Sequence, residues 1–249
     1  MFGFSFLRSA LWTLACATLA AALPAVAAEQ TFERATVTIQ KEYQFLRYLP
    51  AGYDADPTKR WPLVLFLHGA NERGTNIELI KKHGFSKLIA QGKEFPCVVI
   101  SPQCPVGEWW NVVALDALVE KIASEERIDR DRIYVTGLSM GGFGTWALAI
   151  HNPGRYAAIL PICAGGEIQR AWVLRDVPVW TFHGDLDPVV PIVRSQAMVE
   201  AIKAAGGAPK FTVYPGYHHD SWTVTYENPE VLEWLFAQRL SAREKQANN

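Results

Sequence analysis

The sequence predicts an α/β fold: a mostly parallel, twisted β-sheet with helices on both faces. Two observations lead to this class. Short apolar runs recur along the chain and are continuous rather than alternating, as expected for strands that are covered on both faces. Segments with helical periodicity separate these runs, and such alternation is typical of a parallel sheet. The runs lie at residues 64–67, 98–100, 133–135, 157–160, 179–182 and 211–214.

Apolar residues three and four positions apart predict the helices. This spacing is shown by Leu115, Leu118, Val119 and Ile122, and again by Val231, Leu232, Leu235 and Phe236. Before the first run, residues 31–39 and 44–49 are expected to form two antiparallel edge strands. The connection over residues 161–178 is too short for a separate cap domain, which predicts an open cleft.

Length and composition exclude several classes of protein. The chain has 249 residues, enough for one domain with a large core. Its 49% hydrophobic content argues against intrinsic disorder. The 24 basic and 25 acidic side chains leave a net charge of −1. A charge this close to zero gives no footprint for nucleic acid or for an acidic membrane surface, so neither is expected as a partner.

Residues 1–28 have the pattern of an export signal. Arg8 supplies a positive start, residues 11–23 are apolar, and residues 24–28 end in small side chains that a signal peptidase accepts. A membrane anchor is the alternative, but the apolar stretch is short for a span. We therefore expect a periplasmic or secreted protein with no stable membrane span after cleavage, and one domain over residues 29–249.

Three cysteines follow the predicted signal. Cys97 and Cys104 flank the run 98–100, and an extended strand would hold them beyond disulfide reach. A bond between Cys104 and Cys163 is conceivable if both lie in loops at one end of the sheet. Three free, half-buried thiols are the favoured interpretation.

The sharpest motif is G-L-S-M-G-G at residues 137–142, which contains G-x-S-x-G. It follows the run 133–135 and precedes a helical segment, the context in which this motif presents a nucleophilic serine, here Ser139. Glycines are needed because the tight turn leaves no space for neighbouring Cβ atoms. The alternative is a packing loop or a phosphate cradle, but no lysine stands in the P-loop position.

A serine nucleophile needs a base and a group that orients the base. The loop after the run 179–182 contains Asp185 and Asp187, and the loop after the run 211–214 contains His218 and His219. Loops that follow parallel strands emerge at the same carboxyl edge of a sheet. The acid and the histidine are therefore expected beside Ser139, in the chain order typical of this motif.

From Leu63 to its end, the chain resembles the α/β-hydrolase superfamily. Within it, the chain is similar to compact secreted esterases grouped with polyhydroxybutyrate depolymerase-like and feruloyl-esterase-like proteins, some of which are labelled predicted peptidases. The resemblance is carried by residues 67–74, 101–104, 137–142, 183–191 and 216–222. Asn71 and His218 stand where the family pattern has glycine. The resemblance implies an α/β-hydrolase fold without a cap domain.

The family pattern also implies roles for single residues. Its catalytic histidine comes three residues before a tryptophan, here Trp222, which selects His219 and leaves His218 as the alternative. The acid is the second carboxylate of the H-G-x-x-D-x-x-V-P pattern, which is Asp187, and Asp185 is expected to be a turn or capping residue.

The resemblance places the oxyanion hole on two backbone N–H groups, those of Ala70 and Met140. Such donors stabilise the tetrahedral intermediate of acyl transfer. In the same loop, His68 is expected to be satisfied by backbone hydrogen bonds. Glu72 and Arg73 are expected to brace the loop as an ion pair or by hydrogen bonds.

Trp109 and Trp110 follow the run 98–100 at the predicted active edge. Either ring could stack on a sugar, a phenolic acid or an acyl chain, and the alternative is that they close the bottom of a loop. Metal binding at residues 218–220 is disfavoured because the spacing of common zinc sites is missing. His83 and His151 are expected at the surface or at helix ends.

The combined prediction is a cofactor-independent serine hydrolase without a metal, acting on small-molecule or polysaccharide-linked carboxylic esters. Ser139, His219 and Asp187 would form the triad and an acyl-enzyme intermediate. A serine peptidase of the same fold is the first alternative, because ester and amide hydrolysis use the same residues. The second alternative is a catalytically silent carbohydrate-binding protein.

Overall fold

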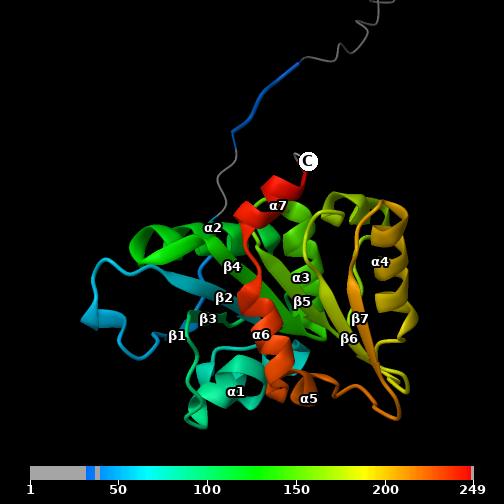
Figure 1. Ribbon diagram of the computed structural model, residues 1–249, viewed down its shortest axis with the longest axis horizontal. Helices are drawn as coiled ribbons and strands as arrows, with labels where there is room; N and C mark the ends of the chain where they lie inside the picture. The colour runs from blue at the N-terminus through cyan, green and yellow to red at the C-terminus, as the bar shows by residue number, and fades with distance from the viewer. Residues whose placement is uncertain (1–31, 37–39, 248–249) are drawn as a thin grey trace, which may run out of the picture. The chain divides into compact units, whose positions relative to one another are not determined.

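The computed structural model describes residues 32–36 and 40–247. The predicted signal over residues 1–28 lies outside the described residues. The chain divides into two compact units, Met1–Gln40 and Lys41–Asn249. In the first unit, residues 32–36 are exposed and form no strand, so this part of the expected edge strand over residues 31–39 is not formed. The other elements belong to the second unit (Figure 1).

The second unit is built on a seven-stranded sheet in the order β1-β3-β2-β4-β5-β6-β7. Every neighbouring pair is parallel except β1 and β3, so β1 is an antiparallel edge strand. The strands are β1 (Phe45–Tyr48), β2 (Trp61–Leu67), β3 (Val98–Pro102), β4 (Ile128–Leu138), β5 (Ala158–Ile162), β6 (Trp180–Gly184) and β7 (Lys210–Tyr214). The predicted α/β class with a mostly parallel sheet is confirmed.

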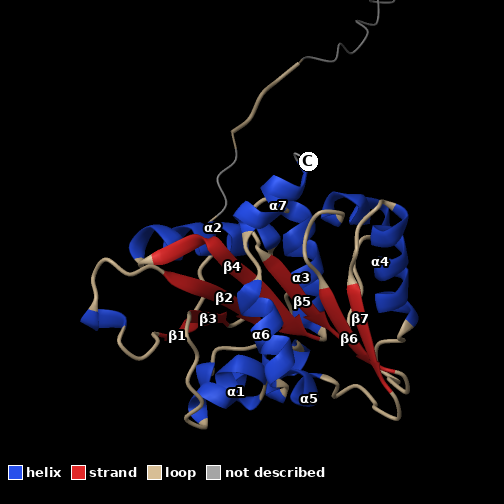
Figure 2. Ribbon diagram, in the orientation of Figure 1, coloured by secondary structure: helices blue, strands red, loops and turns tan. Residues whose placement is uncertain are grey.

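Helices connect the strands, as Figure 2 shows. The α-helices are α1 (Gly84–Ala90), α2 (Val112–Glu125), α3 (Met140–His151), α4 (Val193–Ala204), α5 (Trp222–Glu227), α6 (Pro229–Ala237) and α7 (Leu240–Ala247). The short 3-10 helices are η1 (Tyr53–Ala55), η2 (Ala70–Glu72), η3 (Ile77–Lys82) and η4 (Ile168–Leu174). None of the described helices is both long and apolar enough to cross a membrane.

Each face of the sheet has its own core, and strand β2 shows why. Leu63, Leu65 and Leu67 pack with residues of α2, α3 and α4 on one face. Val64 and Phe66 pack with residues of α1, α5 and α6 on the other face. Successive side chains of a strand point to opposite faces, so a strand covered on both sides needs apolar residues at every position. All seven residues of β2 are buried accordingly.

The helix next to the predicted nucleophile is buried almost all round. Nine of the 12 residues of α3 are buried, including Trp146, Leu148 and Ile150. Helix α2 is amphipathic by contrast, and it begins where the Asn111 side chain accepts a hydrogen bond from the N–H of Ala114. Burial of α3 on so many sides fixes the position of its N-terminus, which carries Met140.

The parallel strands end together at one edge of the sheet. Leu138 at the end of β4 pairs with Ile162 of β5, and Gly184 at the end of β6 pairs with Tyr214 of β7. The residues that follow these ends therefore share an edge. Of the described cysteines, Cys97, Cys104 and Cys163 are free, as favoured, and fully buried rather than half-buried.

Candidate active site

A single residue, Ser139, joins β4 to α3. Its backbone has φ 52° and ψ −120°, a strained conformation for a residue with a Cβ atom. A Cβ atom on Gly137 would lie 2.4 Å from the carbonyl oxygen of Gly141, and one on Gly141 would lie 1.9 Å from that of Leu67. Only glycine fits at these two positions, so the sterically compressed turn predicted for the G-x-S-x-G motif is present.

Cys163, directly after β5, lies beneath this turn. The N–H of Ser139 donates to the carbonyl oxygen of Ile162 at 3.0 Å and lies 3.3 Å from the Cys163 sulfur. Cys163 has φ 43° and no exposed surface. Burial raises the pKa of the Cys163 thiol far above its usual value, so the sulfur is a neutral packing and accepting group.

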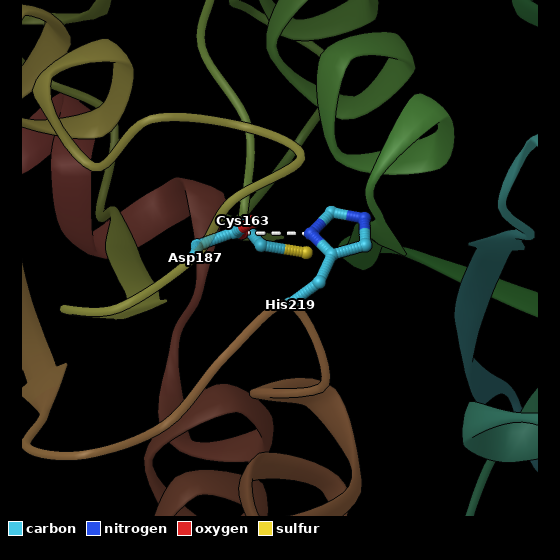
Figure 3. A group of neighbouring side chains, drawn as sticks. All are labelled: Cys163, Asp187 and His219. Carbon is cyan, nitrogen blue, oxygen red and sulfur yellow. Dashed lines mark hydrogen bonds and ion pairs between the residues drawn. The ribbon is translucent and has the colours of Figure 1, made fainter.

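His219, in the loop between β7 and α5, lies between the predicted nucleophile and the predicted acid. Its Nδ1 is 2.7 Å from Oδ2 of Asp187, the contact drawn in Figure 3. Its Nε2 is 2.9 Å from Oγ of Ser139. A carboxylate only accepts, so Nδ1 carries the proton and Nε2 is left to accept one from the serine hydroxyl. This tautomer is the one that general-base catalysis requires.

Asp187 is buried and accepts hydrogen bonds from three donors, namely Nδ1 of His219 and two backbone N–H groups. Its Oδ1 accepts hydrogen bonds from the N–H groups of Val189 and Val190, each at 2.9 Å. Burial alone would raise the pKa of Asp187, but the bonds from His219 and the two amides outweigh it and keep the pKa below its ordinary value. The carboxyl is therefore ionised at neutral pH.

A second imidazole lies beside Asp187, that of His183 near the end of β6, to which the sequence assigned no role. Its Nε2 lies 2.8 Å from the carbonyl oxygen of Val190 and 3.2 Å from Oδ2 of Asp187. Its Nδ1 lies 2.8 Å from the hydroxyl of Ser195 in α4. Burial lowers the pKa of His183, which favours a neutral ring. The sequence feature that could have pointed to His183 is its place as the first residue of the H-G-x-x-D pattern.

Asp185 and His218, the second choices for acid and base, point elsewhere. Oδ1 of Asp185 accepts from the N–H of Gly216 at 2.7 Å, and the exposed His218 places Nδ1 2.9 Å from the carbonyl oxygen of Leu186. Both contacts join the loop after β6 to the loop after β7. They hold together the two loops that carry Asp187 and His219.

The two predicted oxyanion donors lie at helix starts. Ala70 begins η2 and Met140 begins α3, where backbone N–H groups have no acceptor within the helix. A Cβ atom on Gly69 would lie 3.8 Å from Cβ of Ser139, so the loop after β2 passes against the nucleophile. Arg73 braces this loop as expected, since its Nε donates to the carbonyl oxygen of Ala70 at 2.9 Å.

His68 is satisfied by backbone groups, as predicted. Its Nε2 accepts from the N–H of Cys104 at 2.9 Å, and its Nδ1 lies 2.6 Å from the carbonyl oxygen of Gly69. Burial lowers the pKa of His68 to about 4. A neutral imidazole therefore links the loop after β2, which carries the predicted oxyanion donor Ala70, to the segment after β3.

The tryptophan pair divides between surface and core. Trp109 is 63% exposed and packs edge-to-face on Phe143 of α3, with ring centroids 6.1 Å apart. Trp110 is buried, with its ring 4.8 Å from that of His68 and 6.2 Å from that of Tyr43. Phe143 lies one helical turn after Ser139, so Trp109 is an exposed ring on the part of α3 that follows the predicted nucleophile.

One group of metal-ligand types comes together in the described part of the chain. Sγ of Cys163, a carboxylate oxygen of Asp187 and an imidazole nitrogen of His219 lie within 4.8 Å of one another (Figure 3). Two of these groups already bond to each other, and the thiol holds its proton. The donor set fits a hydrogen-bonded hydrolase site better than a metal site.

Sequence comparison points to esterases. Residues 111–229 match the family model for Phospholipase/Carboxylesterase. The chain is similar to a poly(3-hydroxyalkanoate) depolymerase C of Paucimonas lemoignei, with 29% identity over 51% of this chain and 32% of that protein. It is also similar to a probable feruloyl esterase C of Aspergillus terreus, with 24% identity over 60% of this chain and 56% of the relative.

Structure comparison gives a consistent picture. A thermostable esterase superimposes with a TM-score of 0.69 and 35% identity over 78% of this chain and 59% of that one. A feruloyl esterase module of Clostridium thermocellum superimposes with a TM-score of 0.59 at 19% identity, a likeness of fold. The chain spans about a third of the length of the depolymerase it matches.

Proposed function

We propose that this chain is a serine hydrolase of the α/β-hydrolase superfamily that cleaves carboxylic esters through an acyl-enzyme intermediate. The observation that carries the proposal is the hydrogen-bonded sequence from Ser139 through His219 to Asp187, with heavy-atom distances of 2.9 and 2.7 Å. Both distances lie within the range that proton transfer to a general base requires.

In the first half-reaction, Oγ of Ser139 attacks the ester carbonyl carbon while Nε2 of His219 takes the hydroxyl proton. The ionised Asp187 stabilises the imidazolium that forms. The negative oxygen of the tetrahedral intermediate accepts from the N–H groups of Ala70 and Met140, and each such donor is worth about 2.7–4 kcal/mol of barrier. His219 then gives the proton to the leaving alcohol, and the acyl group stays on Ser139.

In the second half-reaction, water takes the place of the alcohol. His219 removes a proton from the water, which attacks the acyl carbon. The carboxylic acid leaves as the proton returns to Oγ of Ser139. Every proton in the cycle moves through Nε2 of His219, so the tautomer set by Asp187 serves both halves.

We further propose that Trp109 contacts the substrate. Its 63% exposure and its packing on Phe143, one turn from Ser139, support this assignment. The buried Trp110 would support the loop from below. Small-molecule or polysaccharide-linked esters are the proposed substrates. The relatives that support this include a bifunctional acetylxylan esterase/xylanase of Neocallimastix patriciarum and the probable feruloyl esterase C. The signal-like pattern of residues 1–28 supports export to the periplasm or beyond.

The test compares the purified protein with a Ser139→Ala variant on short-chain aryl esters and peptide amides. We expect ester turnover and fluorophosphonate labelling in the wild type and neither in the variant, with unchanged circular dichroism. Turnover of amides but not esters would instead establish the peptidase. A folded wild type that neither turns over ester nor labels at Ser139 would contradict the proposal and favour a binding protein.

A further inference from the structure

Side chains from three other segments form a cluster beside His219. Trp222, the first residue of α5, packs edge-to-face on the His219 ring, with centroids 5.2 Å apart and planes at 89°. The same indole meets the ring of His83 at 5.3 Å and 67°. Nε2 of His83 lies 3.8 Å from Oε1 of Glu72. We call Glu72, His83 and Trp222 the supporting cluster.

The hydrogen bond inside the supporting cluster fixes the His83 tautomer. Nε1 of Trp222 lies 3.3 Å from Nδ1 of His83. An indole N–H can only donate, so Nδ1 is the acceptor and the proton of the neutral ring is on Nε2. That N–H is on the nitrogen near the carboxylate of Glu72. The hydrogen bond therefore joins Trp222 to His83, and Nε2 of His83 lies 3.8 Å from the Glu72 carboxylate, close enough for an electrostatic contact but not for a hydrogen bond.

Glu72 connects the supporting cluster to the oxyanion loop. It is 3% exposed and ends η2, the 3-10 helix that Ala70 begins. A Cβ atom on Gly69 would lie 3.1 Å from Oε2 of Glu72 and 3.8 Å from Cβ of Ser139. The carboxylate thus lies beside Gly69, which also neighbours Ser139. A buried carboxylate is costly without compensation, and Nε2 of His83 at 3.8 Å supplies a nearby electrostatic contact.

The position of the His219 ring depends on more than its two hydrogen bonds. Bonds through Nδ1 and Nε2 define a line across the ring, and the ring can still swing about that line as the proton moves. Trp222 contacts the ring side-on and restricts this motion. Trp222 is itself held by the acceptor on His83, which stands at the junction of η3 and α1.

We propose that Glu72, His83 and Trp222 are positioning residues that hold the His219 ring in the orientation where Nε2 meets Oγ of Ser139. This inference rests on the proposed function, since it assigns the cluster a role in the same reaction. It predicts that the acceptor on residue 83, rather than an imidazole as such, is what the reaction needs. The supporting cluster also connects two loops through its side chains, the loop that carries Ala70 and the loop that carries His219.

The decisive comparison is His83→Ala against His83→Asn, because asparagine can place an acceptor near the position of Nδ1. In the otherwise unchanged protein, His83→Ala is expected to lower kcat for an aryl ester by tenfold to a hundredfold, as a misplaced catalytic group does, with KM within about twofold of wild type. Fluorophosphonate labelling should slow by the same factor. His83→Asn should restore kcat to within about threefold of wild type.

Two further variants test the other members of the cluster. Trp222→Phe keeps an aromatic ring but loses the donor, and Glu72→Gln keeps the shape but loses the charge. Both are expected to lower kcat rather than raise KM. Glu78→Gln is the matched control for Glu72, because Glu78 is an exposed acid in η3 that pairs with Lys81, and it should leave kcat unchanged.

A spectroscopic measurement keeps the inference separate from the proposed function. The downfield proton resonance of His219 Nδ1 reports the bond to Asp187 without any turnover. We expect it to broaden or shift in folded His83→Ala and to return in His83→Asn. An unchanged resonance and kcat in His83→Ala, or a loss that His83→Asn does not recover, would overturn the inference. An inactive wild type whose resonance still responds would sink only the esterase assignment.

Discussion

Nε2 of His183 lies 3.2 Å from Oδ2 of Asp187, the same oxygen that receives the hydrogen bond from His219. The proposed acid thus has two imidazoles beside it and accepts hydrogen bonds from two backbone amides. One imidazole is the proposed base, and the other is a neutral ring with no exposed surface.

Removing the second imidazole should therefore affect both stability and rate. His183→Ala leaves the Ser195 hydroxyl without its ring partner and opens space behind Asp187. We expect a loss of about 2–5 kcal/mol of unfolding free energy and a fall in kcat. Urea unfolding and aryl-ester kinetics measure the two effects. His151→Ala, at the exposed end of α3, is the control, and equal losses in both variants would contradict the assignment.

Asp187→Asn should change the tautomer of His219 while leaving the fold intact. An amide at this position can donate to Nδ1 and so stabilise the wrong tautomer of His219, for which a loss of about 10⁴-fold in kcat is typical. Asp185→Asn is the matched control, because that carboxylate accepts from Gly216 in the loop contact and does not reach His219. Comparable losses of kcat in the two variants would show that the acid has been misassigned.

The turn at the nucleophile should be intolerant of a single methyl group. In Gly141→Ala the new Cβ atom would lie 1.9 Å from the carbonyl oxygen of Leu67, a backbone atom of the central strand β2. We expect a destabilisation above about 4 kcal/mol and little folded protein. Gly154→Ala is the control, since its new Cβ atom would meet nothing closer than 4.0 Å. Soluble expression and thermal melting compare the two, and a cooperative melt of Gly141→Ala near that of wild type would refute the steric argument.

The buried histidines predict how stability depends on pH. The folded-state pKa of His68 is lowered from 6.5 to about 4, so between these values the unfolded chain binds more protons than the folded one. Unfolding free energy should fall as the pH drops from about 6.5 toward 4, and His183 adds in the same direction. Asp187 adds a further loss at lower pH, when its carboxyl takes up a proton.

Urea unfolding measured from pH 7 to pH 4 checks this dependence. The slope of unfolding free energy against pH should be shallower in a folded His68→Gln variant, because one of the titrating groups is gone. A variant that is less stable at every pH but keeps the wild-type slope would show that His68 does not titrate in this window.

The two adjacent tryptophans should behave in opposite ways. Trp109→Ala removes an exposed ring, so we expect a higher KM for aryl esters with unchanged stability. Trp110→Ala removes a ring packed against His68 and should cost about 3–5 kcal/mol of unfolding free energy. Steady-state kinetics and urea unfolding on both variants test the division. A reversed pattern would mean that Trp110 rather than Trp109 meets the substrate.

The sheet was predictable because its strands are covered on both faces, which forces continuous apolar runs such as residues 64–67. The geometry around Ser139 was predictable for a similar reason, since a turn this tight admits only glycine at positions 137 and 141. The order of acid and histidine along the chain then followed from the parallel strands, whose ends share one edge.

The proposed role of His83 and the position of Cys163 beside the Ser139 turn could not be predicted from the sequence. His83 lies 139 residues from Trp222, and only the tertiary fold brings the two rings together. Of the strand expected over residues 31–39, the described residues 32–36 are exposed and do not form it.

The proposed reacting atoms lie at a strand end or in loops that are joined close to the strand ends. Ser139 follows β4 with no residue between, and the stems of the other two loops are clamped by Asp185 and His218. The hydrogen-bonded pairing of the strands therefore sets the distances between the proposed catalytic side chains. Lengthening or shortening the outer parts of these loops would alter which substrates enter while leaving the proposed catalytic residues in place. Substrate selectivity in this scaffold can therefore diverge faster than the reaction itself.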